Sequence, residues 1–203
     1  MKKNKLILIA GLSASGKTSL ANYFEDFLPN SIRINIDDYA VNLYKTIGFL
    51  NKNEKKRLKY SAKIMALENM KYMINKGHDV IMEYCWSFKD EELLYEYLKK
   101  IQITPIIITV RVDCSYKTAY KRYLERKSNF EYAKNFYSNC YPVKTEADID
   151  RNWTFEEYKE KTPEGCDSFF FGKHLISIDM ENTETLKKRH QKYDDALLKV
   201  IKI

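Results

Sequence analysis

The feature that most constrains the fold of this chain is an eight-residue segment near its start, Gly11 to Thr18. It reads G-L-S-A-S-G-K-T and fits the phosphate-binding pattern G-x-x-x-x-G-K-[ST] at every fixed position. The apolar run Leu6–Ala10 before it predicts a buried strand, and residues 18–24 after it have helical character. Because this is the context in which the motif binds anions, the segment, here called the phosphate loop, is predicted to hold the phosphates of a nucleotide.

Each residue type in the phosphate loop has a physical role. Glycine at positions 11 and 16 allows backbone turns that a side chain would resist, so that successive N–H groups can point at one anion. The helix that follows adds a dipole that favours negative charge. Lys17 is expected to reach the β- and γ-phosphates, and the Thr18 hydroxyl is expected to bind Mg²⁺. The residues expected to bind the nucleotide are Gly11, Ser13, Ala14, Ser15, Gly16, Lys17, Thr18 and Ser19.

Strand signals alternate with helical signals along the whole chain. Apolar or alternating runs at 6–10, 31–36, 80–82, 105–112 and 174–179 predict five strands, and the run at 105–112 is the strongest. This order predicts an α/β protein, a three-layer P-loop NTPase fold with a five-stranded parallel sheet and right-handed crossovers. The 203 residues contain no Pro/Gly/Ser-rich linker, so we expect one domain over residues 1–203.

Two carboxylates follow predicted strands. Ligands bind at the carboxyl ends of parallel strands, so Asp37 and Glu83 are both expected to face the phosphates. Asp37 is the predicted base, which would accept the proton of an acceptor hydroxyl or hold Mg²⁺ through water. The alternative is that Asp37 or Asp38 caps the next helix. Glu83 stands where a Walker B acid would stand and is predicted to hold a magnesium-bound water.

A second informative region follows the strand at 105–112. Arg122 and Arg126 lie one turn apart on a helix that Ser115 begins, so they share one face. They are predicted to stabilise charge on the transferred phosphate, and salt bridges on a surface helix are the alternative. Residues 128–153, rich in Tyr, Phe and Asn, lack a clean period and predict a helical lid or an acceptor-binding insert.

Together with N-I-D-D-Y at 35–39, the phosphate loop resembles the small P-loop kinases. The kinase domain of phage polynucleotide kinase is the most similar in pattern, and chloramphenicol phosphotransferase, adenylylsulfate kinase and zeta toxin are similar in plan. The resemblance implies that Lys17 and Thr18 handle ATP and Mg²⁺, that Asp37 is the base, and that Arg122 and Arg126 enter a lid over the donor phosphates.

The sequence departs from the polynucleotide kinase pattern at Ala40. In that pattern an arginine here grips the phosphate of the substrate, which argues against a polynucleotide acceptor. Lys45 or Arg151 could replace the missing charge. Glu83 is a milder departure, because the group usually has Asp at this position.

The composition of the chain limits the kinds of molecule that the protein is expected to bind. Lys and Arg exceed Asp and Glu by 35 to 28, and the formal net charge of +7 favours anionic partners, ATP and nucleic acid alike. The densest basic block, residues 52–57, fits the solvated face of an amphipathic helix. The four cysteines lack metal-binding spacing and no apolar run could span a bilayer, so we expect a cytoplasmic protein with reduced thiols and no membrane contact.

These patterns predict an ATP-dependent phosphotransferase that moves the γ-phosphate to a hydroxyl of a small molecule or nucleotide. GTP stays open as the donor, because no N-K-x-D-like base-reading signature is present. Two alternatives stay open as well. One is a polynucleotide 5′-hydroxyl kinase, favoured by the basic charge and by the N-I-D-D-Y segment. The other is a regulatory nucleotide-binding NTPase, because a fold alone does not fix a function.

Overall fold

The computed structural model describes residues 3–181, 183 and 185–203. At its centre lies a sheet of five parallel strands in the order β2-β3-β1-β4-β5. The predicted parallel α/β sheet is therefore confirmed, with the strand before the phosphate loop in the middle. The strands are β1 (Lys5–Ala10), β2 (Ser31–Asn35), β3 (Asp79–Glu83), β4 (Ile106–Asp113) and β5 (His174–Asp179).

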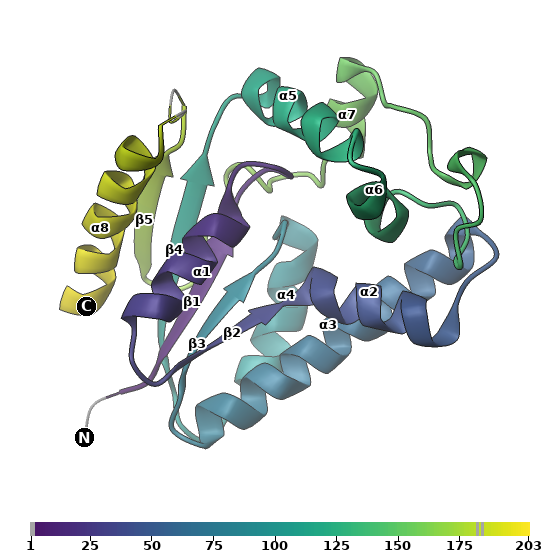
Figure 1. Ribbon diagram of the computed structural model, residues 1–203. Helices are drawn as coiled ribbons and strands as arrows, with labels where there is room; N and C mark the ends of the chain where they lie inside the picture. Colours follow the sequence, from purple (N-terminus) through teal and green to yellow (C-terminus); the bar gives the residue numbers. More distant parts are fainter. Residues whose placement is uncertain (1–2, 182, 184) are drawn as a thin grey trace.

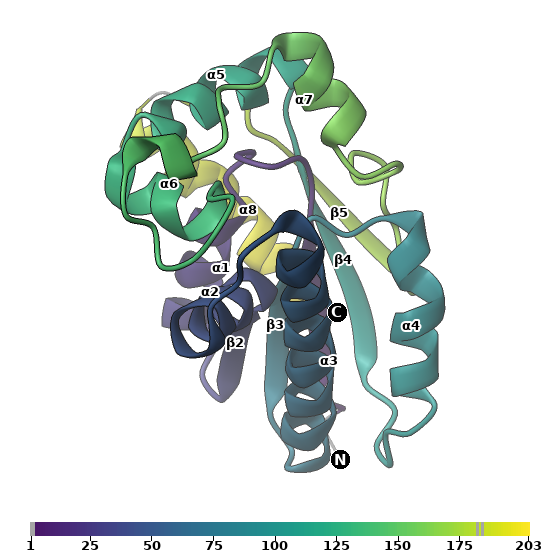
Figure 2. The ribbon, with the colours of Figure 1, turned by 90° about the vertical axis from the view of Figure 1, so that its right-hand side faces the viewer.

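Helices cover both faces of this sheet and one of its ends. Figures 1 and 2 show α1 and α8 on one face, and α3 and α4 on the other. α5, α6 and α7 lie beyond the carboxyl ends of the strands, in the connection from β4 to β5 (Figure 1). The three layers and the helical lid are thus as predicted. The helices are α1 (Lys17–Phe27), α2 (Ile36–Ile47), α3 (Lys52–Asn75), α4 (Phe88–Leu98), α5 (Tyr116–Lys127), α6 (Phe130–Phe136), the 3-10 helix η1 (Glu146–Asp148), α7 (Phe155–Lys161) and α8 (Leu186–Lys202).

Two apolar layers hold the helices on the sheet. Ile7 and Ile9 of β1 pack toward α1 and α8, whereas Leu6 and Leu8 pack toward α3 and α4. Burial on both faces explains why the strands read as nearly continuous apolar runs. Trp86, just after β3, is fully buried in the second layer and so belongs to the core. In the part of the chain that the structure describes, no helix has the length and apolar character needed to cross a membrane.

Candidate functional site

The phosphate loop turns tightly between β1 and α1. Gly11 has a φ of +137° and Gly16 a φ of +112°, a region that L side chains avoid. A Cβ atom on Gly11 would lie 2.4 Å from the carbonyl oxygen of Val112, so the turn also lacks room for one. The Lys17 ammonium donates to the carbonyls of Gly11 and Leu12, at 3.1 and 2.7 Å. The loop therefore has the strained, glycine-dependent shape that the motif predicts.

A cavity of about 560 Å³ opens beside the phosphate loop, and we call it the phosphate cavity. It brings together side chains from four elements that the sequence separates: Ser13, Lys17, Thr18 and Ser19 from the loop and α1, Asp37 and Asp38 from α2, Glu83 from the end of β3, and Arg126 from α5. Most of the predicted site residues thus line one cavity. Gly11, Ser15 and Gly16 form the turn behind it.

Asp37 lies in the first turn of α2 with its carboxylate available to the cavity. The cap of this helix is Asn35, whose side chain accepts from the backbone N–H of Asp37 at 2.9 Å. The alternative that Asp37 or Asp38 caps the helix is therefore wrong. The Asp37 carboxylate lies 3.5 Å from the Lys59 ammonium, and its charge raises the pKa of Lys59 above the usual range for lysine.

Glu83 is buried at the end of β3 and pairs with an arginine that the sequence reading missed. Arg33 of β2 donates to one carboxylate oxygen through Nε at 2.8 Å and also through Nη2. β2 runs beside β3, with Asn35 opposite Glu83. Because side chains alternate along a strand, the spacing of Arg33 and Asn35 could have indicated a shared side.

The oxygen donors of the phosphate cavity fit a magnesium ion. Thr18 supplies a hydroxyl, and Asp37, Asp38 and Glu83 supply carboxylates. Among the described residues no cluster of three or more His, Cys, Asp or Glu side chains could cage a metal by itself. That sparse set suits Mg²⁺, which is usually bound through one or two carboxylates together with substrate phosphates.

The two lid arginines have different contacts. Arg122 donates to the backbone carbonyls of Ser15 at 3.3 Å and Met180 at 3.1 Å, so it clamps the phosphate loop to the turn after β5. Arg126 lines the phosphate cavity, and its guanidinium lies 6.0 Å from the ring centroid of Tyr132. Of the two arginines, Arg126 is the one that lines the phosphate cavity.

A smaller cavity of about 230 Å³ lies on the α8 side of the phosphate loop, and we call it the side cavity. Ala14, Ser19 and Arg126 line both this cavity and the phosphate cavity. The remaining walls come from the loop, α5, the turn after β5 and α8: Ser15, Gly16, Arg122, Glu125, Met180, Thr183, Arg189 and Tyr193. The two spaces thus adjoin at the start of α1.

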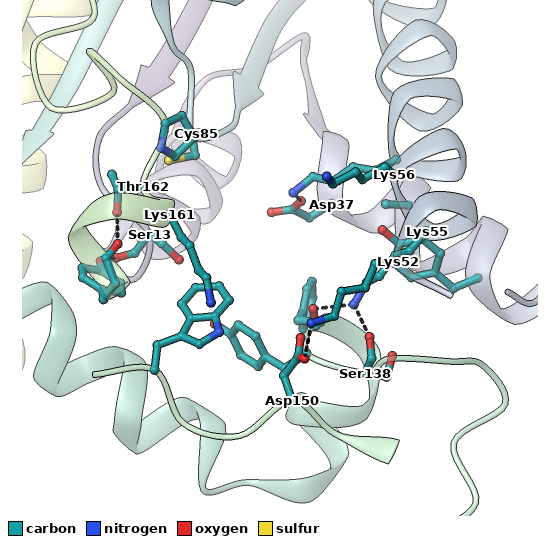
Figure 3. A pocket seen from close by; sticks show the side chains of 18 of the residues that line it. Ser13, Asp37, Lys52, Lys55, Lys56, Cys85, Ser138, Asp150, Lys161 and Thr162 are labelled. Atoms are coloured by element: carbon teal, nitrogen blue, oxygen red, sulfur yellow. Dashed lines mark hydrogen bonds and ion pairs between the residues drawn. The ribbon is translucent and has the colours of Figure 1, made fainter. Parts of the chain in front are cut away.

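A third cavity, of about 540 Å³, extends from Asp37 between α3 and the lid, and we call it the lysine cavity (Figure 3). Asp37, Ser13, Tyr84, Tyr132 and Phe136 line both this space and the phosphate cavity. Its other walls include Tyr44, Cys85, Tyr137, Ser138, Asp150, Trp153 and Tyr158, with the lysines Lys52, Lys55, Lys56, Lys59 and Lys161. The basic block at 52–57 is therefore more than the solvated face that we expected.

The end of α6 and the residues after it are attached to α3 by lysines that line the lysine cavity. The Lys55 ammonium donates to the carbonyls of Phe136 at 2.9 Å and Ser138 at 2.8 Å, and Lys52 pairs with Asp150 at 2.9 Å. Phe49 and Tyr141 form an isolated antiparallel bridge with backbone hydrogen bonds of 3.2 and 2.8 Å. The lid segment, residues 128–153, therefore contacts α3 and the turn before it.

A family model described as an AAA domain matches residues 7–138, which is more than half of the chain. The chain belongs to this family of AAA domains. The matched part of this AAA domain runs from β1 past α6 and contains the phosphate loop, Asp37, Glu83 and both lid arginines. No curated protein matches the chain.

Solved kinase structures share the fold of this AAA domain. A Chloroflexus aurantiacus J-10-fl protein assigned as a kinase matches with a TM-score of 0.70 at 19% identity, over 94% of this chain and 96% of that chain. A Sinorhizobium meliloti 1021 gluconokinase matches at 0.53 and 10% identity, over 98% and 95%. A chain of the Pnkp1/Rnl/Hen1 RNA repair complex matches at 0.51 and 19% identity, over 63% of this chain and 39% of that chain. The resemblance to P-loop kinases is thereby confirmed as a kinase-like fold.

Proposed function

We propose that this AAA domain protein is an ATP-dependent phosphotransferase that moves the γ-phosphate to a hydroxyl of a small molecule or nucleotide. The observation that carries the proposal is the position of Asp37, which lines both the phosphate cavity and the lysine cavity. A carboxylate at this border can face a γ-phosphate on one side and an acceptor hydroxyl on the other. Phosphoryl transfer requires chiefly such positioning, together with charge stabilisation.

The donor would occupy the two cavities that meet at the phosphate loop. Its phosphates would accept from the loop N–H groups, with Lys17 at the β- and γ-oxygens and Arg126 above them. The nucleobase of the donor would enter the side cavity, where Arg122 and Met180 form part of the wall. Arg122 already holds the loop to the turn after β5, so its role in this proposal is to position the loop.

The transfer itself would be a direct displacement. The acceptor hydroxyl oxygen bonds to the γ-phosphorus while the bond from that phosphorus to the bridging oxygen breaks, and ADP leaves with the bridging oxygen. Asp37 accepts the hydroxyl proton as the new bond forms. Thr18 and Glu83, directly or through water, would hold Mg²⁺, which when bound neutralises charge on the phosphates.

The test is γ-phosphate transfer from radiolabelled ATP to nucleosides, sugars, antibiotics and 5′-hydroxyl oligonucleotides. We expect at least one acceptor to stimulate turnover, and we expect Asp37→Asn to lower kcat by about 10²–10⁴-fold, the range of general-base catalysis. Lys17→Ala should abolish nucleotide binding or its use. Asp26→Asn is the matched control for the base, because Asp26 is an exposed aspartate of α1 that lines neither cavity.

Three outcomes would contradict parts of this proposal. ATP turnover that no acceptor stimulates, together with nucleotide-dependent binding of a partner, would favour a regulatory NTPase. Unchanged transfer by Asp37→Asn would show that another group is the base. Efficient labelling of oligonucleotides that falls steeply with salt would identify a polynucleotide kinase instead.

A further inference from the structure

The lysine cavity carries more positive charge than its own carboxylates neutralise. Five lysines and two aspartates line it. Lys52 pairs with Asp150 at 2.9 Å, and Lys59 pairs with Asp37 at 3.5 Å. Within residues 3–181, 183 and 185–203, no carboxylate lies within ion-pair distance of the remaining three, which are Lys55, Lys56 and Lys161.

These three lysines stand on opposite walls of one space. Lys55 and Lys56 lie in the first turns of α3, and Lys161 ends α7. Figure 3 shows Lys161 reaching into the cavity from one side and Lys55 from the other, with Asp37 facing the same opening. The Lys161 ammonium lies 4.5 Å from the ring centroid of Trp153, which fixes its approach. An anion bound between the two walls would be close to lysines of both.

The cavity also limits the size of what it can hold. Its volume of about 540 Å³ falls in the range of small-molecule sites. Lys52 and Lys55, which line it, contact Asp150 and the carbonyls of Phe136 and Ser138, so these contacts bound the cavity between α3 and the lid. An extended polymer that passed between α3 and the lid there would have to break them, whereas a small molecule would not.

The positive charge of the lysine cavity does not come from Lys45 or Arg151, the two positions that the sequence suggested. Ala40 lines the cavity without a charge, and neither Lys45 nor Arg151 is among the lining residues. Arg151 instead donates to Glu157, with its Nη1 at 2.9 Å from the carboxylate. The anion-binding capacity is therefore carried by lysines of α3 and α7.

We propose that the acceptor is a small hydroxyl compound that already bears a phosphate group, which Lys55, Lys56 and Lys161 bind while the hydroxyl faces Asp37. This inference rests on the proposed function, because it names the acceptor class for the same site. Lysine ammonium groups are strong point-charge partners for phosphate oxygens. A phosphate dianion would offset charge that the cavity leaves uncompensated.

The experiment uses matched pairs of acceptors with and without a phosphate: adenosine with adenosine 3′-monophosphate, and glucose with glucose 6-phosphate. A 5′-hydroxyl oligonucleotide is a further arm. Radiolabel transfer is measured for the wild type, Lys56→Gln and Lys161→Gln. The control is Lys71→Gln, because Lys71 lies on α3 outside the cavity and pairs with Glu68.

The phosphorylated member of at least one pair should have a KM about tenfold or more below that of its neutral partner, as one charge-assisted contact allows. Lys56→Gln and Lys161→Gln should each raise that KM about tenfold and change the KM of the neutral member by less than about twofold. Lys71→Gln should change neither. A weaker preference for the phosphorylated member at high salt is also expected.

Equal KM values within every pair would overturn the inference, as would lysine variants that affect both members alike. A lower KM for the oligonucleotide than for every small compound would overturn the small-molecule part.

If no compound is labelled, the proposed function fails by itself. The lysine site is then tested by titrating inorganic phosphate into protein saturated with a non-hydrolysable ATP analogue. Binding that the double variant Lys56→Gln/Lys161→Gln weakens supports the site, and no binding refutes it.

Discussion

Gly11 has no room for a side chain. Its φ of +137° disfavours any side chain, and a Cβ atom there would lie 2.4 Å from the Val112 carbonyl oxygen. Gly11→Ala should therefore displace the phosphate loop, abolish measurable nucleotide binding and lower stability by about 1–3 kcal/mol, the cost of one strained residue. Calorimetric titration of nucleotide and thermal unfolding measure the two effects.

Gly77 provides the control for that substitution. It also has a positive φ, +92°, but no atom lies within 4 Å of the position of its added Cβ. Gly77→Ala should lower the free energy of unfolding by about 1–2 kcal/mol, the cost of holding an alanine in a left-handed conformation, and leave nucleotide binding unchanged. Loss of binding in both variants would mean that general instability, and not the shape of the loop, explains the Gly11 result.

Cys85 should be the most reactive thiol. A hydrogen bond from Cys166, aided by the charge of Lys17, lowers the pKa of Cys85, whereas burial raises the pKa of Cys114 to about 11. The thiolate is the reactive form, so limited iodoacetamide near neutral pH should modify Cys85 first. Peptide mass spectrometry identifies the site, and earlier modification of Cys114 or Cys140 would contradict the prediction.

At the scale of elements, the Arg33–Glu83 pair joins the carboxyl ends of β2 and β3. Glu83 is buried, so Arg33→Met would leave its charge without a partner and should cost about 3 kcal/mol. The double variant Arg33→Met/Glu83→Leu should recover much of this loss, because it removes both charges. Denaturant unfolding of both single variants and the double variant measures the coupling, and strictly additive costs would refute it.

Lys55 couples α3 to the lid in a way that depends on pH. Burial lowers its pKa from 10.5 to about 8, Asp150 opposes this shift, and Lys59 and Lys52 add to it. Below about pH 8 the lysine is charged in both the folded and the unfolded states, and the burial penalty is complete. Between about 8 and 10.5 the unfolded state holds a proton that the folded state lacks, so the contribution of Lys55 to stability rises with pH.

The measurement is the free energy of unfolding of the wild type minus that of Lys55→Met across this pH window. The difference should increase toward pH 10.5. Taking the difference removes the titration of other lysines and tyrosines that both proteins share. A flat difference would show that Lys55 is not desolvated by its contacts with the lid segment.

Local patterns predicted the elements that have a local cause. β5 spans His174–Asp179 as its alternation indicates, and capping boxes at Ser87 and Thr154 begin α4 and α7. The lid helix α6 has only seven residues, too few for a visible period. The lysine cavity was not predictable, because Lys56 and Lys161 are far apart in the sequence and line one cavity only in the folded chain.

At the scale of the whole molecule, the lid holds the phosphate loop from outside. The Tyr158 hydroxyl of α7 donates to the Ser13 carbonyl at 2.8 Å, and Arg122 of α5 donates to that of Ser15. The same lid segment rests on α3 through Lys55 and the Phe49–Tyr141 bridge. The lid therefore contacts both the phosphate loop, beside the phosphate cavity, and α3, beside the lysine cavity.

The shared position of Asp37 has a consequence for the order of kinetic events. Asp37 lines both cavities, so the proposed function requires the two substrates to be bound together, and the phosphoryl group should pass directly between them in a ternary complex. Double-reciprocal plots of rate at several fixed acceptor concentrations should therefore intersect. Parallel lines, or a radiolabelled enzyme recovered after incubation with ATP alone, would instead mean that the phosphoryl group rests on the protein between two half-reactions.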